Sequence, residues 1–292
     1  MDAANLVVNT IIPIFLIIAI GYVIGKKKEA DVQPIVDLIV YISGPALIFT
    51  SVKKSDVVLG NMATIFSAAA LIIITQGIIV YFILKRGRPR KTGLYLPMVI
   101  GNTGYLGYPV ALFAFGNAGL SNAIIYDMTN SLFIFSLGIY IVHHRNEFRE
   151  IFKVPLIYAV LGGIAFKFFS IDVPWIIFEP LEMVGSITIP AALLVLGYKL
   201  TQIKISNFKI SFFAACFKIF GGLLIGLAAV NLLNISGLAR SIILIESAMP
   251  SAVMSMILTH KYGRNPEIVA SVVFLTTLMS IPTIPLILFF LA

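Results

Sequence analysis

The stretch VIGNTGYLGYPVALFAFG, residues 99–116, decides how this chain folds. It lies inside an apolar run long enough to cross a bilayer, yet its centre holds glycines at 101, 104 and 107, followed by Pro109. Unpaired backbone is tolerated at membrane depth only where protein surrounds it or where it lines a wet cavity. The stretch therefore predicts a membrane helix that is broken near its middle, at a place enclosed by other helices.

The composition indicates that most of the surface faces lipid. Of the 292 residues, 59% are hydrophobic and 12% are charged, whereas soluble domains carry about 25% charged residues. The net charge of +8 would suit nucleic acid, but the basic residues lie in short clusters such as KRGRPRK (85–91) between apolar blocks. That pattern is typical of membrane topology, so no nucleic-acid partner is expected. A single cysteine, Cys216, excludes a disulfide framework.

Apolar blocks of about 20 residues, the length that spans a bilayer, predict ten transmembrane segments. Alternate loops carry sixteen and four Lys or Arg residues, which places the richer set in the cytoplasm and both termini outside the cell membrane. The first block is expected to remain as a helix, because its lysines, 26–28, follow it rather than precede it. The predicted segments are 6–25, 34–52, 62–84, 94–115, 121–142, 154–170, 175–198, 208–233, 239–260 and 267–291.

The two halves of the chain resemble each other. YISGPALIFTSV (41–52) aligns with SITIPAALLVLG (186–197), and FGNAGLSNAIIYDMTNSL (115–132) aligns with YGRNPEIVASVVFLTTL (262–278). Because five spans is an odd number, the second half must insert upside down. We therefore predict two inverted five-helix repeats, residues 1–142 and 154–292. Inverted repeats are typical of secondary transporters, whose sites form near the midplane from broken helices.

The opening stretch has a counterpart in the second half. The ninth segment reads IILIESAMPSAVMSMILTHKYG (242–263), in which Pro250 takes the place of Pro109 and Glu246 lies one turn earlier. Two breaks at equivalent places predict a polar substrate site, because helix ends expose free N–H and carbonyl groups. Simple kinks or close helix packing are the alternative. The predicted substrate-binding residues are Asn102, Thr103, Gly104, Pro109, Met249, Pro250 and Ser251.

Charged side chains within membrane segments are rare and usually functional. Glu246 is the strongest candidate, because it precedes a helix break where ions or protons could reach it. Asp127 and Lys218 are the other two. Lys218 is predicted to be a charge partner, paired with Asp127 or facing Glu246, with attraction of an anionic substrate as the alternative.

Four motifs together resemble the auxin efflux carrier family, which includes the plant auxin carriers and bacterial carriers of malate and malonate. The motifs are IPIFLIIAIGYVIGK (12–26), YISGPALIF (41–49), GNTGYLGYP (101–109) and ESAMPSAV (246–253). The resemblance implies the ten-helix inverted fold of the related bile acid:sodium symporters, and a homodimer. It also implies a scaffold, residues 6–52 and 154–198, and a transport core, residues 62–142 and 208–291. The chain lacks the Asn-Pro-Asn triplet of the plant carriers, so auxin itself is not implied.

The same resemblance implies an ion-coupling set. In the symporters a Glu on the ninth segment, together with polar residues on segments three to five, binds Na⁺, and hard oxygen ligands of this kind suit a small cation. A possible Na⁺ would lie at Glu246, Asn102 and Gln76. Interhelical hydrogen bonding is the alternative role for the uncharged members. The full ion-coupling set implied here is Glu246, Gln76, Asn102, Asp127, Thr129, Asn130 and Ser131.

The expected function is secondary transport of a small organic anion, auxin-like or malate- or malonate-like, by alternating access at a midplane site. Transport would be coupled to Na⁺, to H⁺ or to no ion. The alternative function is a channel or an uncoupled facilitator for a small solute. The sequence holds no HExxH, G-x-S-x-G or P-loop motif, which argues against an enzyme and against ATP as the energy source. Besides the substrate, the expected partners are membrane lipids.

Overall fold

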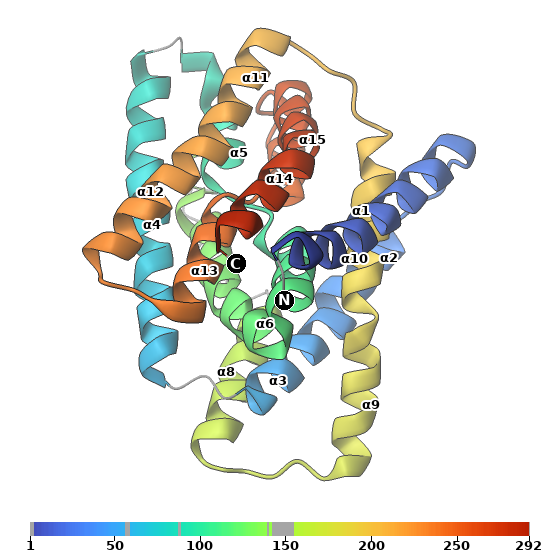
Figure 1. The fold of residues 1–292 in the computed structure, drawn as a ribbon. Helices are drawn as coiled ribbons and strands as arrows, with labels where there is room; N and C mark the ends of the chain where they lie inside the picture. Colours follow the sequence, from blue (N-terminus) through green and yellow to red (C-terminus); the bar gives the residue numbers. More distant parts are fainter. Residues whose placement is uncertain (1–2, 56–58, 87–88, 139, 142–154, 292) are drawn as a thin grey trace.

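The computed structural model describes residues 3–55, 59–86, 89–138, 140–141 and 155–291 (Figure 1). These residues form helices joined by short non-helical links, and the one β pairing among them is an isolated antiparallel bridge between Gly101 and Ser251. The predicted central loop, 143–153, and part of the basic cluster at 85–91 lie outside the described residues. The all-α membrane class expected from composition is confirmed.

The helices of the first half follow the predicted segments closely. A π-helical stretch joins α2 to α3, and another leads into α6. The helices are α1 (Ala3–Lys27), α2 (Gln33–Leu38), α3 (Gly44–Lys54), α4 (Leu59–Arg86), α5 (Tyr95–Val99) and α6 (Tyr108–Phe133).

The second half repeats this pattern of long and interrupted helices. Here a π-helical stretch, Phe217–Gly221, joins α11 to α12. The helices are α8 (Pro155–Phe168), α9 (Trp175–Ser186), α10 (Thr188–Leu200), α11 (Phe208–Cys216), α12 (Gly222–Leu232), α13 (Gly237–Ser247), α14 (Val253–Lys261) and α15 (Pro266–Leu291).

Seven helical stretches in the described residues are long and apolar enough to cross a membrane, and α8 is a shorter apolar helix. The chain is therefore a multi-pass membrane protein. The count is below ten partly because α13 and α14 are separate short helices, and partly because residues 103–136 form one stretch. That stretch bends at Gly116, whose φ of 65° and ψ of −160° are not helical. The ten-span inverted arrangement and its two halves stay predictions.

Two glycines that the sequence alignment placed over each other share an unusual backbone conformation. Gly116 has a φ of 65° and Gly263 has a φ of 64°. A side chain is disfavoured at such angles, so glycine is the residue that allows the chain to turn there. Each glycine comes shortly before a long helical stretch that packs beside a broken segment.

The predicted breaks are present, but one lies elsewhere than expected. α5 ends at Val99 and α13 ends at Ser247, and irregular residues follow each helix. Pro250 lies in the second irregular stretch as predicted. Pro109, by contrast, lies in the first turn of α6, where proline's missing N–H costs nothing. The prediction of a break at Pro109 is therefore wrong, and the first break falls at residues 100–102.

The helices pack closely within two groups, and α1 also contacts α6 and α15 across them. α1 packs along α10, and α3 packs against α8 and α9. The contact between α1 and α10 is so close that a Cβ at Gly197 would collide with the backbone of Ile18. α4, α6, α12 and α13 form the other group, with α15 against α11 and α14. The two broken segments belong to this second group.

Candidate functional site

The two irregular stretches lie side by side and satisfy each other's backbone. The amide of Asn102 donates to the carbonyl of Pro250 at 2.7 Å, and the amide of Ala252 donates to the carbonyl of Ile100 at 3.1 Å. A helix that ends inside a membrane leaves such groups without partners. Here each break supplies the partner that the other lacks, so the two must be formed together.

Side chains from neighbouring helices hold both breaks in place. Asn130 Nδ2 donates to the Gly101 carbonyl at 2.9 Å, and Gln76 Nε2 donates to the Met98 carbonyl at 2.8 Å. In the second break, Ser251 Oγ donates to the Pro97 carbonyl at 2.5 Å, and the Ser251 amide donates to Thr276 Oγ1 at 3.1 Å. The predicted residues Gln76, Asn130 and Ser251 therefore have identifiable structural partners.

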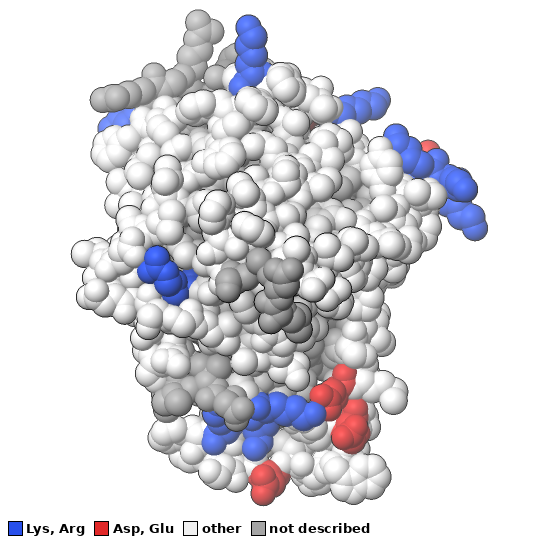
Figure 2. All heavy atoms as spheres, in the orientation of Figure 1, with Lys and Arg blue, Asp and Glu red and all other residues white. Residues whose placement is uncertain are grey.

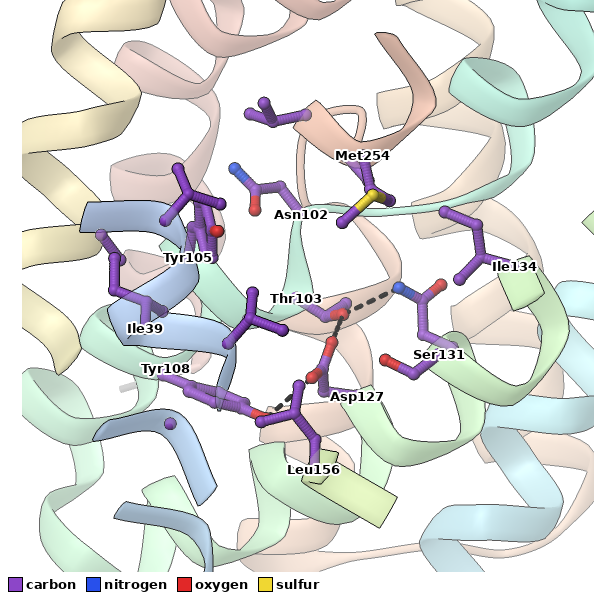
Figure 3. A pocket seen from close by; sticks show the side chains of 18 of the residues that line it. Ile39, Asn102, Thr103, Tyr105, Tyr108, Asp127, Ser131, Ile134, Leu156 and Met254 are labelled. Atoms are coloured by element: carbon purple, nitrogen blue, oxygen red, sulfur yellow. Dashed lines mark hydrogen bonds between the residues drawn. The ribbon is translucent and has the colours of Figure 1, made fainter. Parts of the chain in front are cut away.

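A cavity of about 290 Å³ opens beside the first break. Its walls come from both helix groups: α2, α3, α8 and α10 on one side, and the broken segments and α6 on the other. Most of the lining is apolar, with a few polar groups gathered near residues 102–108 (Figure 3). Such a mixture is typical of a small-molecule site. Of the described residues that line the cavity, Asp127 is the one acid and Lys199 the one base.

Asp127 is held by two hydroxyl groups at the cavity wall. Thr103 Oγ1 donates to one carboxyl oxygen, and Tyr108 OH donates to the other at 2.7 Å (Figure 3). Asn130 Nδ2 in turn donates to Thr103 Oγ1 at 2.9 Å. Asp127 is therefore already hydrogen-bonded within the protein and makes no ion pair among the described residues.

Two buried donors beside the cavity have no hydrogen-bond partner among the described residues. They are Asn102 Nδ2, from the first break, and Thr188 Oγ1, from the start of α10. Both residues are 5% exposed, and both line the cavity. Because a buried polar group without a partner costs about 1–3 kcal/mol, this pair marks the place where a ligand could accept hydrogen bonds.

Glu246 and Lys218 lie deeper and do not line this cavity. Each is 1% exposed. Neither carboxylate oxygen of Glu246 has a hydrogen-bond partner among the described residues, and the carboxylate lies directly against Gly107. Lys218 Nζ donates to the Ser247 carbonyl at 3.3 Å. The predicted alternative in which Lys218 pairs with Asp127 is not formed; the two charges interact instead with hydroxyls and a carbonyl.

The structure divides the sequence-predicted site residues into two sets. Those that line the cavity are Asn102, Thr103, Gly104, Asp127, Asn130 and Ser131. Those outside its lining are Gln76, Pro109, Thr129, Lys218, Glu246, Met249, Pro250 and Ser251. Sequence reasoning missed Tyr108, Thr188 and Lys199. Tyr108 lies within the quoted stretch, whereas no local signal distinguishes Thr188 or Lys199 from ordinary residues of a membrane helix.

The residues expected to bind Na⁺ each make a different contact in the structure. The Gln76 amide nitrogen is bound to the Met98 carbonyl, and Asn102 lines the cavity. The Glu246 carboxylate lies against Gly107 instead. No group of three or more His, Cys, Asp or Glu residues that could hold a metal occurs in the part of the chain that the structure describes. A Na⁺ ion shared by Glu246, Asn102 and Gln76 stays a prediction.

Comparison with known proteins gives a consistent picture. A family model described as "Membrane transport protein" matches the chain twice, over residues 6–151 and 145–288. An uncharacterized transporter of Methanocaldococcus jannaschii is 28% identical, over 95% of this chain and 96% of its own length. An uncharacterized transporter of Methanothermobacter thermautotrophicus is 27% identical over the same shares. These relatives are similar to the chain from end to end.

Proposed function

Because the chain belongs to the membrane transport protein family, whose members are auxin efflux carrier-like, we propose that it is a secondary transporter of a small organic anion. The observation that carries the proposal is the pair of unpaired donors, Asn102 Nδ2 and Thr188 Oγ1, at one cavity. A carboxylate only accepts hydrogen bonds, so it complements two donors that have no acceptor. Bound there, it would restore both missing hydrogen bonds.

The cavity also suggests the form of the substrate. Lys199 lines the cavity at the end of α10 and supplies a positive charge, with Asp31 as its electrostatic neighbour. Apolar residues of α2 and α14, including Val36 and Met254, form much of the remaining wall. A carboxylate with a small apolar body therefore suits the site better than a compact dicarboxylate such as malonate, which would leave a second charge against apolar side chains.

Alternating access is the proposed mechanism of transport. The cavity lies between α2, α3, α8 and α10, which belong to the predicted scaffold, and the broken segments, which belong to the predicted core. A substrate that contacts Thr188 on one side and Asn102 on the other would bridge the two groups. The two family matches, one in each half, support a repeat, and we propose that its two copies are inverted. Movement of the core against the scaffold would then carry the site across the cell membrane.

Glu246 is the residue we propose for coupling to an ion gradient. Its buried carboxylate lacks hydrogen-bond partners among the described residues, and a buried carboxylate that makes no hydrogen bond is costly to keep ionised. The break that follows Glu246 is hydrogen-bonded to the break that holds Asn102. A change in charge at Glu246 would therefore act on the same backbone that positions the substrate.

Uptake of radiolabelled organic acids into proteoliposomes tests the proposal. The panel is indole-3-acetate, benzoate, malate and malonate, each measured under imposed H⁺ and Na⁺ gradients. We expect saturable uptake of a monocarboxylate, with Asn102→Ala and Thr188→Val raising KM about tenfold or more, as loss of a hydrogen bond to a charged group predicts. Thr64→Val, near the start of α4 and outside the cavity lining, is the matched control and should leave KM unchanged.

Two results would contradict the proposal. Non-saturable flux without acceleration by substrate on the opposite side would indicate a channel, and no uptake of any acid would remove the substrate class. Glu246→Gln tests the coupling separately, because it keeps the size of the side chain and removes its charge. We expect this variant to lose gradient dependence while still binding substrate. If its gradient dependence equals that of the wild type, Glu246 has a structural role.

A further inference from the structure

Lys218 is a fully buried ammonium at the meeting point of the two breaks. It lies on the π-helical stretch between α11 and α12, is 1% exposed, and donates to the carbonyl of Ser247. Ser247 is the last residue of α13. Carbonyls at a helix end have no partner within the helix and carry partial negative charge. The ammonium therefore binds the end of a half-helix inside the membrane, as a free cation would.

The first break also approaches this ammonium. A Cβ built at Gly101 would lie 3.6 Å from Lys218 Nζ and 3.6 Å from the Glu246 carbonyl. Gly101 is also the residue bridged to Ser251 in the second break. Lys218 Nζ thus lies close to backbone of both broken segments, although its own segment contains neither break.

Glycines on its own segment make room for this arrangement. A Cβ at Gly222 would collide with the Ser247 carbonyl, and a Cβ at Gly226 would overlap the Ser247 hydroxyl. The spacing GLLIG, residues 222–226, is the small-residue pattern that allows two membrane helices to approach closely. The close approach brings the Ser247 carbonyl within reach of Lys218.

The positive charge has a nearby counter-charge but no direct ion pair. Glu246 is the acid that interacts electrostatically with Lys218, and the two ion pairs found among the described residues involve Lys53 and Lys54 instead. Lys218 supplies one positive charge to this region, where Asp127 also acts on Glu246.

In the first half of the chain, an uncharged side chain donates to the end of the half-helix before the break, as Lys218 does in the second half. Gln76, on the segment before the first break, donates to the Met98 carbonyl near the end of α5. Lys218, on the segment before the second break, donates to the carbonyl at the end of α13. Both side chains therefore bind the end of a half-helix, but Lys218 alone brings a charge.

We propose that the Lys218 ammonium is a built-in cation that occupies the place of a coupling Na⁺ at the crossing of the two breaks. The protein then needs no Na⁺ to form its site. The proposal rests on the transport function proposed above, because only a transporter would use a coupling ion at this site. Its test, however, measures folding stability and not transport. Failure to find a transported acid would therefore leave this proposal to be judged on its own result.

The experiment compares melting temperatures of purified protein in nanodiscs, in NaCl and in choline chloride at equal ionic strength. The wild type should melt at the same temperature in both salts. Lys218→Ala should melt lower in choline and regain roughly 2–4 °C in NaCl, because a ligand that binds only the folded state raises its stability. Lys209→Ala, an exposed lysine on the same segment, is the matched control and should show no difference between the salts.

Lys218→Gln serves as a second variant if Lys218→Ala does not fold, since it keeps a donor for the Ser247 carbonyl and removes the charge. Either folded variant should show the Na⁺ effect. The proposal is overturned if the wild type is itself stabilised by Na⁺ over choline, or if a folded variant shows no Na⁺ effect. Should neither variant fold, the wild-type comparison alone decides the outcome.

Discussion

Gly107 packs against Glu246, the residue proposed for coupling, and leaves no room there for a side chain. A Cβ at this position would overlap both carboxylate oxygens of Glu246. Inserting a methyl group into a well-packed interior typically costs about 1–3 kcal/mol. Here the atoms that must move are those of a buried carboxylate with no hydrogen-bond partner in the described residues. The glycine therefore sets the position of Glu246 relative to the first break.

We expect Gly107→Ala to reduce uptake at least about tenfold and to lower the melting temperature by several degrees, since the Glu246 carboxylate must leave its place. Gly60→Ala is the matched control, because a Cβ there meets no atom within 4 Å, and it should be neutral. Thermal unfolding and proteoliposome uptake measure the two effects. Normal uptake by Gly107→Ala would show that the position of Glu246 is not critical.

Among the elements, the broken helices were predicted from the sequence, but the position of the first break was not. Glycine and proline at membrane depth predicted that two segments are interrupted, and they are. The sequence placed the first break on Pro109, however, because proline can either start a helix or disrupt one. In the structure Pro109 starts α6, while Gly101 and Asn102 bond across to the other break. That choice depends on a partner about 150 positions away, which no local pattern reveals.

The two halves use equivalent threonines differently, and this difference is testable. Thr276 Oγ1 accepts from the Ser251 amide and donates to its own helix, whereas Thr129 Oγ1 donates to the Ile125 carbonyl of its own helix. Thr276→Val leaves a buried amide without a partner, which costs about 1–3 kcal/mol. We expect it to lower the melting temperature by several degrees. Thr129→Val should have a much smaller effect, and equal effects would contradict a specific role for the Ser251 bond.

For the whole molecule, the sequence predicted the class and the order of helices but not the cavity. Asn102 could be named because it lies in the quoted stretch. Thr188 and Lys199 could not, because they become site residues only when α10 faces the first break across the cavity.

Charge is unevenly distributed over the molecule. In Figure 2 the upper end shows mainly basic side chains, whereas acidic and basic ones lie together at the lower end.

This uneven charge leads to the prediction that the link between α8 and α9 faces outside and the link between α10 and α11 faces the cytoplasm. The link between α8 and α9 lies at the lower end of the molecule (Figure 1). Asp172 of this link pairs with Lys53, and Glu182 of α9 pairs with Lys54, so basic residues here are offset by acidic ones. Cytoplasmic loops, by contrast, carry an excess of Lys and Arg. Cysteines introduced at Asp172 and Gln202 test this topology. Both positions are exposed, and one predicted span, residues 175–198, separates them. The native cysteine is removed by Cys216→Ser. A membrane-impermeant maleimide should label Asp172→Cys in right-side-out vesicles and Gln202→Cys only in inverted ones. The reverse pattern would invert the topology and place the termini in the cytoplasm, and labelling of both from one side would contradict a single span between them.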